Sequence, residues 1–192
     1  MHRTRWYPSL IGLEDGTLLC MGGRDDERAP ELTPELFNPT TGTWDLLTGA
    51  TSEEAFGEGG WSYPRSFLAP NGKAFVMPNK RRRAYYLSPE GNGSIEQAVD
   101  FSSTVSTNRH LAVMYRQHKL LNLRDEDASI LTLRANGDIS IKDVADLATK
   151  RFWSEGVILA NGEVMVTGGS TVSQDRDTAC LLYTSPSPRD RG

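Results

Sequence analysis

The sequence has few of the features that mark several common functional classes. Among its 192 residues are two cysteines and three histidines, too few to indicate a disulfide framework or a zinc site. No apolar run approaches the length of a membrane helix, and MHRTRWYPSL at the start has no long apolar region of the signal-peptide kind. The net charge is only −4, which argues against nucleic acid as the main partner. We therefore expect no membrane span and no nucleic-acid partner, and secretion cannot be read from this N-terminus.

Signs of hydrolase or metal chemistry are equally scarce. No Gly-x-Ser-x-Gly sequence occurs, and the neighbours Glu53 and Glu54 are predicted to be solvated in a polar loop. His110 and His118 stand eight residues apart, without His-x-His or His-x-x-x-His spacing, and are most simply surface or turn residues. Cys20 lies between apolar neighbours and is predicted to be a small core residue.

A repeat is the strongest positive signal in the chain. RWYPSLIGLEDGTLLCMGG at residues 5–23 returns in relaxed form as RFWSEGVILANGEVMVTGG at 151–169, with the same spacing of Arg, turn Gly and Gly pair. A third copy, WSYPRSFLAPNGKAFVMPN at 61–79, keeps the Asn-Gly turn, and a fourth, TNRHLAVMYRQHKLLNLRD at 107–125, keeps only the two apolar runs. We conclude that the chain is built from about four similar units.

The spacing of the units indicates propeller blades. If Gly16, Gly72, His118 and Gly162 are equivalent turn positions, the steps between them are 56, 46 and 44 residues. Periods of about 40–50 residues with short strands and tight turns are typical of β-propellers. A Gly in a two-residue loop can take the positive φ of a primed turn, so each unit is predicted to begin with a hairpin. Further strand-turn-strand segments are predicted over residues 35–47, 84–97 and 129–143.

The two clearest hairpins can be placed by residue. The first is predicted to pair residues 10–13 with 17–21, and the last to pair 157–160 with 163–167. The segment IKDVADLATKRF at 141–152 has a spacing that suits a short helix, but a connection between strands explains it equally well.

We therefore predict an all-β chain: a partial β-propeller of kelch type with about four four-stranded blades, the last incomplete. The expected domain covers residues 1–179, with blades at about 3–50, 58–103, 104–148 and 149–179. The tail CLLYTSPSPRDRG at 180–192 resembles translated sequencing-adapter read-through where a closing strand is due, and a disordered extension is the alternative.

Three segments together resemble one family. RWYPSLIGLEDGTLLCMGG, FNPTTGTW at residues 37–44 and RFWSEGVILANGEVMVTGG look like the kelch-type propeller of the galactose oxidase and glyoxal oxidase family, the copper radical oxidases. The resemblance implies oxidation of a primary alcohol or aldehyde by dioxygen, with release of hydrogen peroxide. It also implies one copper ion with two tyrosines and two histidines, one tyrosine being joined to a cysteine by a thioether. A small alcohol, aldehyde or carbohydrate substrate and an extracellular location follow from the same resemblance.

One residue of that copper site matches a position in this chain. Tyr7 stands where the family has the cross-linked tyrosine, so it is the candidate radical residue and copper ligand. The remaining ligands are expected outside the chain, which implies copper in a longer parent protein and no tight copper binding by this chain alone. Packing between blades is the alternative role for Tyr7.

Repeat equivalence adds further candidates at the mouth of the propeller channel. Tyr63 and Trp153 occupy the position of Tyr7 in their own units, and Trp6 precedes Tyr7. Arg24 follows the Gly pair, where galactose oxidase has an aromatic residue that covers the thioether. The resemblance therefore leaves the stacking partner of Tyr7 open.

A second function from another class is compatible with the same fold. A non-catalytic kelch propeller would bind a glycan or a protein through its loops. The polar loop at residues 25–35 and exposed rings such as Trp61 and Tyr85 would carry that binding, since sugars stack on exposed aromatic faces.

Overall fold

The computed structural model describes residues 1–101 and 109–172. Within these ranges the protein is almost entirely β, with fourteen strands in four sheets, one short α-helix and one 3-10 turn. The predicted all-β, propeller-type fold is confirmed. The chain divides into a first unit, Met1–Asn108 with Leu133–Ser140, and a second unit, Arg109–Thr132 with Ile141–Gly192. The predicted read-through tail at 180–192 lies outside the described residues.

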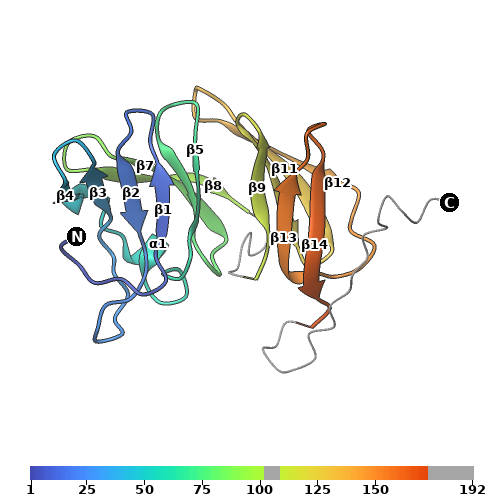
Figure 1. Ribbon diagram of the computed structural model, residues 1–192, viewed down its shortest axis with the longest axis horizontal. Helices are drawn as coiled ribbons and strands as arrows, with labels where there is room; N and C mark the ends of the chain where they lie inside the picture. The colour runs from blue at the N-terminus through green and yellow to red at the C-terminus, as the bar shows by residue number, and fades with distance from the viewer. Residues whose placement is uncertain (102–108, 173–192) are drawn as a thin grey trace. The chain divides into compact units, whose positions relative to one another are not determined.

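The first unit contains two antiparallel four-stranded sheets, each in simple chain order (Figure 1). The first sheet consists of β1 (Ser9–Gly12), β2 (Leu18–Met21), β3 (Glu35–Asn38) and β4 (Thr43–Leu46). The second consists of β5 (Arg65–Leu68), β6 (Ala74–Met77), β7 (Arg83–Ser88) and β8 (Ser94–Asp100). The strand-turn-strand segments predicted at residues 35–47 and 84–97 are therefore present as β3–β4 and β7–β8.

The core of the first unit lies where these two sheets meet the short helix. Strand β6 is buried at every position, because it is an inner strand covered on both faces. Between the sheets lie η1 (Thr48–Ala50) and α1 (Glu53–Phe56), and the Ser52 hydroxyl caps α1 by accepting a hydrogen bond from the Ala55 N–H. The core residues are Leu19, Met21, Leu47, Ala50, Ala55, Phe56, Ala74, Val76, Tyr85 and Leu87.

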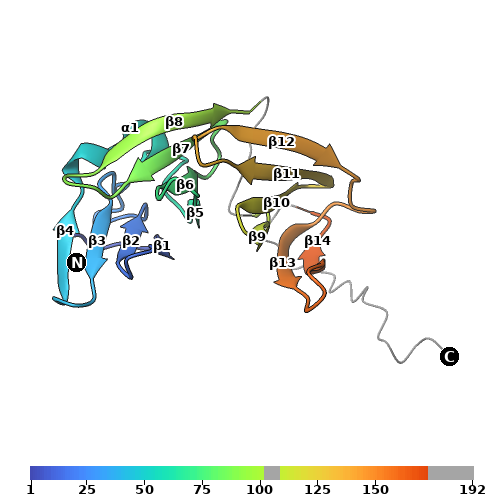
Figure 2. The same ribbon diagram turned by 90° about the horizontal axis from the view of Figure 1, so that it is seen from above.

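The second unit contains most of the last two sheets (Figure 2). The end of β11, the β11–β12 turn and the start of β12, residues Leu133–Ser140, belong to the first unit. One sheet has the order β12-β11-β10-β9, and β13 pairs with β14 in a two-stranded sheet. The strands are β9 (Ala112–Arg116), β10 (Lys119–Arg124), β11 (Asp127–Leu133), β12 (Ile139–Val144), β13 (Phe152–Ile158) and β14 (Val164–Ser170). Residues 141–144, considered above as part of a short helix, belong to strand β12. Among the described residues no helix is long and apolar enough to cross a membrane.

The glycine turns differ in one respect from the prediction. The loops at Gly16, Gly72 and Gly162 contain three residues rather than two. Each Gly N–H donates to the carbonyl of the residue three positions earlier, and the N–H of that residue donates to the carbonyl of the residue after the Gly. For Gly16 this second bond joins the Leu13 N–H to the Thr17 carbonyl at 2.9 Å. The three glycines have φ values of 83°, 77° and 81°, as expected for the left-handed residue of a three-residue hairpin loop.

The repeat extends to individual hydrogen bonds. Arg5 Nη1 donates to the Gly22 carbonyl at 2.8 Å, and its counterpart Arg151 donates to the Gly168 carbonyl at 2.7 Å. Gly22 and Gly168 have φ values of 65° and 64°. The conserved geometry explains why the Arg and the Gly pair recur together: the left-handed first Gly turns its carbonyl towards the guanidinium.

His118 occupies a turn that strains an ordinary side chain, and replacing it by Gly is expected to stabilise the fold. Its φ is 60°, and its Nδ1 is buried without a hydrogen-bond partner among the described residues. Left-handed backbone costs a non-Gly residue about 1–2 kcal/mol, so we expect His118→Gly to raise the free energy of unfolding by about 1 kcal/mol in urea titration. Gln117→Gly is the control: Gln117 has no positive φ, so this change should lower stability. Equal destabilisation by both changes would contradict the strain argument.

Candidate functional site

The predicted site residues of the first unit are held together by main-chain hydrogen bonds. The Trp6 N–H donates to the Arg24 carbonyl at 2.8 Å, and the Arg24 N–H returns a bond of 3.0 Å to Trp6. The Tyr63 N–H donates to the Tyr7 carbonyl at 3.0 Å, and the Gly23 N–H donates to the Trp61 carbonyl at 2.7 Å. These bonds join the entry to β1 to the entry to β5, so residues far apart in the sequence form one local cluster.

The aromatic residues at the repeat-equivalent position share an unusual backbone conformation. Tyr7, Tyr63 and Trp153 have φ values of 65°, 47° and 62°. A bulky residue rarely adopts positive φ, and it does so only where the surrounding contacts hold the backbone in that conformation. Because all three equivalents share the strain, it belongs to the repeat architecture, which turns each ring out of the strand direction.

The hydrogen bond that joins two successive repeats is found in both units. The Trp153 N–H donates to the Arg109 carbonyl at 2.8 Å, just as Tyr63 donates to Tyr7. Arg109 is thus the counterpart of Tyr7 in the third repeat, nine residues before His118. Trp153 lies in the second unit, with the Arg109 guanidinium 5.8 Å from its ring centre.

Four rings of the first unit are stacked in a row, which we call the ring stack: Trp61, Trp6, Tyr7 and Tyr63. The ring centres of Trp61 and Trp6 are 6.3 Å apart, those of Trp6 and Tyr7 3.8 Å, and those of Tyr7 and Tyr63 4.7 Å. The angles between successive ring planes are 22°, 19° and 23°. Offset, nearly parallel rings at these separations attract one another by about 0.5–1.5 kcal/mol per pair beyond area burial.

Arg24 lies over Trp61, at one end of the ring stack, and not over Tyr7. Its guanidinium lies 4.2 Å from the centre of the Trp61 ring, a cation–π distance. Its Nη2 donates to both carboxylate oxygens of Glu58, at 2.8 and 2.7 Å. The stacking partners of Tyr7, left open by the sequence, are therefore Trp6 and Tyr63.

The ring stack is open to solvent at its middle and at its Tyr63 end. Trp6 is 58% exposed, Tyr7 39% and Tyr63 42%. Partial desolvation, with a smaller contribution from Tyr7, raises the pKa of Tyr63 above the ordinary phenol value. Tyr7 is thus partly accessible to solvent.

Three side chains lie elsewhere than the sequence suggested. Tyr85 is 4% exposed and belongs to the core, and Trp61 has one face under Arg24, so these rings do not form an open sugar platform. His110 is 7% exposed instead of lying on the surface, because its Nε2 pairs with Asp125 at 3.1 Å and its ring stacks on Phe152. Cys20 is buried as predicted, and burial raises the pKa of its thiol.

Ionisation of two buried phenols is expected to lower the stability of the fold at high pH. Desolvation, aided by nearby acidic groups, raises the pKa of Tyr85 and of Tyr86 to about 12. In the unfolded chain a phenol titrates near pH 10, so the native state is favoured while these groups stay protonated. The stabilisation is complete below pH 10 and is lost as the pH rises through 12.

Absorbance at the phenolate wavelength measures this effect. We expect the folded protein to show a late phenolate step near pH 12 that the urea-unfolded chain lacks, and Tyr86→Phe to shrink that step. A single step near pH 10 in both states would show that the two phenols are not desolvated.

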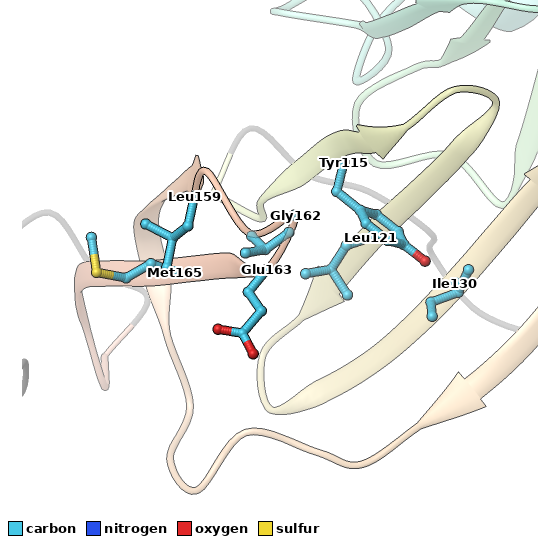
Figure 3. Close-up of a pocket in the computed structure, with 8 residues that line it drawn as sticks. Tyr115, Leu121, Ile130, Leu159, Gly162, Glu163 and Met165 are labelled. Atoms are coloured by element: carbon cyan, nitrogen blue, oxygen red, sulfur yellow. The ribbon is translucent and has the colours of Figure 1, made fainter.

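A separate hollow of about 590 Å³ lies in the second unit (Figure 3). Its lining is mainly apolar, and its single carboxylate, Glu163, accepts a hydrogen bond from Asn161 Nδ2 at 2.9 Å. The lining residues are Tyr115, Leu121, Ile130, Leu159, Gly162, Glu163, Val164 and Met165. With one carboxylate already paired to a turn residue, this hollow has no arrangement for acid–base work.

The part of the chain that the structure describes contains no group of three or more His, Cys, Asp or Glu side chains able to hold a metal ion. A phenolate oxygen and imidazoles are suitable donors for copper, but copper takes several ligands. In the ring stack Tyr7 is the one side chain matched to the family's copper site.

Comparison with known proteins supports the resemblance described above. Aldehyde oxidase GLOX1 of Arabidopsis thaliana is 25% identical over 221 aligned residues, which cover 96% of this chain and 35% of the plant protein. The resemblance to the glyoxal oxidase family is confirmed. The chain spans about a third of the length of this curated relative. No family model matches the sequence.

Solved structures support the propeller-type fold. A fungal alcohol oxidase of the AA5 family, in complex with copper, has a TM-score of 0.74 at 21% identity, over 88% of this chain and 38% of its own. YjhT has a TM-score of 0.63 at 15% identity, over 86% of this chain and 59% of its own. At these identities the likeness concerns the fold. The glyoxal oxidase relation itself rests on the sequence match.

Sequence reasoning missed the stacking role of Trp6 and Trp61. The signal was present, because Trp61 stands two residues before Tyr63 and Trp6 one before Tyr7, so each of these two repeats brings two aromatic residues to its strand entry. The order of the rings was not readable, since it depends on positive φ at Tyr7 and Tyr63.

Proposed function

We propose that the chain is part of a copper radical oxidase that oxidises a primary alcohol, an aldehyde or a carbohydrate alcohol with dioxygen and releases hydrogen peroxide. The observation that carries the proposal is the setting of Tyr7, a solvent-accessible phenol stacked between Trp6 and Tyr63 at the position that matches the family's cross-linked tyrosine. By the same relation we place the parent protein outside the cell.

The residues of this chain have defined parts in the proposal. Tyr7 supplies the phenol that is oxidised by one electron, which two-electron oxidation with a single copper ion requires as a second redox centre. Trp6 and Tyr63 hold its ring on both sides, and the bond from the Tyr63 N–H to the Tyr7 carbonyl fixes its backbone. Stacked π systems spread an unpaired electron and limit access to the ring.

The parent protein provides the decisive test. Sequencing the parent gene through both ends of this chain should reveal a cysteine-bearing blade upstream, and a Tyr-His pair with a further histidine downstream. In that protein Tyr7→Phe should abolish peroxide release from alcohols and aldehydes, whereas Trp44→Phe, at a ring that packs on Phe37, should retain it. Complete kelch blades without those residues, or full activity in Tyr7→Phe, would refute the proposal and favour a binding propeller.

The 192-residue chain alone should behave differently from the parent. The family resemblance matches one copper ligand in this chain, and copper takes several. We therefore expect equilibrium dialysis to show no tight copper binding, and a peroxide assay with alcohols or aldehydes to show no hydrogen peroxide release. Stoichiometric tight copper with a visible radical absorption band would contradict this expectation.

A further inference from the structure

The ring stack joins four oxidisable side chains without an intervening aliphatic residue. Tryptophan and tyrosine are the aromatic side chains that lose one electron most readily, and every neighbouring pair in the stack has its ring centres within 6.3 Å. The smallest separation, 3.8 Å between Trp6 and Tyr7, brings the two π systems into van der Waals contact. Direct contact between π systems is the arrangement in which an electron moves from one ring to the next.

The charges around the ring stack favour electron transfer in one direction. The Arg24 guanidinium lies 4.2 Å from the centre of Trp61, so a positive charge on that ring is disfavoured, although Glu58 offsets part of the effect. Trp6 has no such contact with Arg24 and is the most exposed ring of the four. A positive hole formed on Trp61 therefore moves towards Trp6 and on to Tyr7.

Tyr7 is the end of the path because it can release a proton. A tryptophan that has lost an electron carries a positive charge, whereas an oxidised tyrosine loses its phenolic proton and becomes neutral. Tyr7 is 39% exposed, so that proton can pass to water. Tyr63 stacks on Tyr7 rather than on a tryptophan, so Tyr7 is the first phenol next to Trp6 in the ring stack.

We propose that the ring stack is a one-electron transfer path, by which a one-electron oxidant that meets Trp61 or Trp6 oxidises Tyr7. In the first step the oxidant takes an electron from a tryptophan and is reduced by one electron. In the second, Tyr7 gives an electron to that tryptophan and its phenolic proton to water, which leaves a neutral tyrosyl radical and a restored indole. The use of this path in the parent rests on the proposed function; the path in this chain does not.

Laser flash-quench oxidation of the 192-residue chain tests the path without copper. A photogenerated ruthenium(III) polypyridyl complex serves as the one-electron oxidant, and transient absorption follows the indole radical and the tyrosyl radical separately. We expect the tyrosyl signal to grow as the indole signal decays, with one shared rate constant. Tyrosyl radical that appears with no matching indole decay would overturn the proposal even without any variant.

Matched variants locate the path. Trp6→Phe keeps a stacked ring but removes the oxidisable indole, so the tyrosyl signal should be lost, as it should in Tyr7→Phe. Trp153→Phe removes a tryptophan of comparable exposure, 43%, outside the ring stack and should leave the signal unchanged. A tyrosyl signal of wild-type size in Trp6→Phe would mean direct oxidation of Tyr7 and would overturn the path. That outcome would leave the proposed function standing, since peroxide release by the parent tests the function independently.

Discussion

Replacing Glu35 by alanine will lower the free energy of unfolding by about 3–5 kcal/mol, the range typical of breaking a buried ion pair. Glu35 Oε1 lies 3.1 Å from Arg5 Nη2, and both side chains are fully buried. Without the carboxylate the Arg5 charge remains buried, with carbonyl oxygens such as those of Gly22 and Thr33 as its partners. Two main-chain N–H groups, of His2 and Arg3, lose their acceptor as well. Urea unfolding followed by tryptophan fluorescence measures the loss.

A surface ion pair provides the control for this prediction. Lys73 pairs with Glu96, whose side chain is 58% exposed. Exposed ion pairs contribute about 0–1 kcal/mol, so Glu96→Ala should change stability by less than about 1 kcal/mol. Similar losses in Glu35→Ala and Glu96→Ala would contradict the central role assigned to the Arg5–Glu35 pair.

Gly22→Ala is expected to have the second large effect, because a methyl group at this position meets main chain. The Cβ would lie 2.4 Å from the Trp61 carbonyl oxygen, and the φ of 65° is itself unfavourable for alanine. The backbone term alone is about 1–2 kcal/mol, and the displacement of Trp61 brings the expected loss to about 3 kcal/mol or more. Trp61 is part of the ring stack, so the near-ultraviolet circular dichroism of the stacked rings should weaken too.

Gly168 in the second unit is a closely matched control for Gly22. It occupies the same repeat position with a φ of 64°, but its Cβ would meet no atom within 4 Å among the described residues. Gly168→Ala should therefore cost only the backbone term, about 1–2 kcal/mol. Equal losses in the two variants would show that the contact with Trp61 does not matter.

The repeat made much of the fold predictable. Because Arg5 and Arg151 stand at the same distance from their turn glycines, the period and the hairpins could be read directly. Strands β1 and β2 lie close to the predicted ranges, whereas β13 begins at Phe152, before the predicted range, and ends at Ile158. The fold class followed from the period. The loop length at Gly162 was predicted wrongly, because the predicted ranges left two residues there and both two-residue and three-residue loops use a left-handed Gly.

The site was only partly predictable, for physical reasons. Repeat equivalence predicted Tyr7 and Tyr63 at one channel mouth, and their rings stack with centres 4.7 Å apart. Burial of Tyr85 was missed because the sequence does not show which strands pack against it in the core of the first unit. The burial of His110 was missed in the same way, because its partner Asp125 is fifteen residues away.

The hydrogen bonds of Glu35 also set an order for folding. Its carboxylate binds His2, Arg3 and Arg5 across 33, 32 and 30 residues of sequence, so the segment before β1 has few local contacts of its own. Contacts that close such long loops form late, after the local hairpins are in place. Trp6 and Tyr7 follow directly in this segment. We therefore expect the aromatic cluster to assemble only after the first sheet is complete.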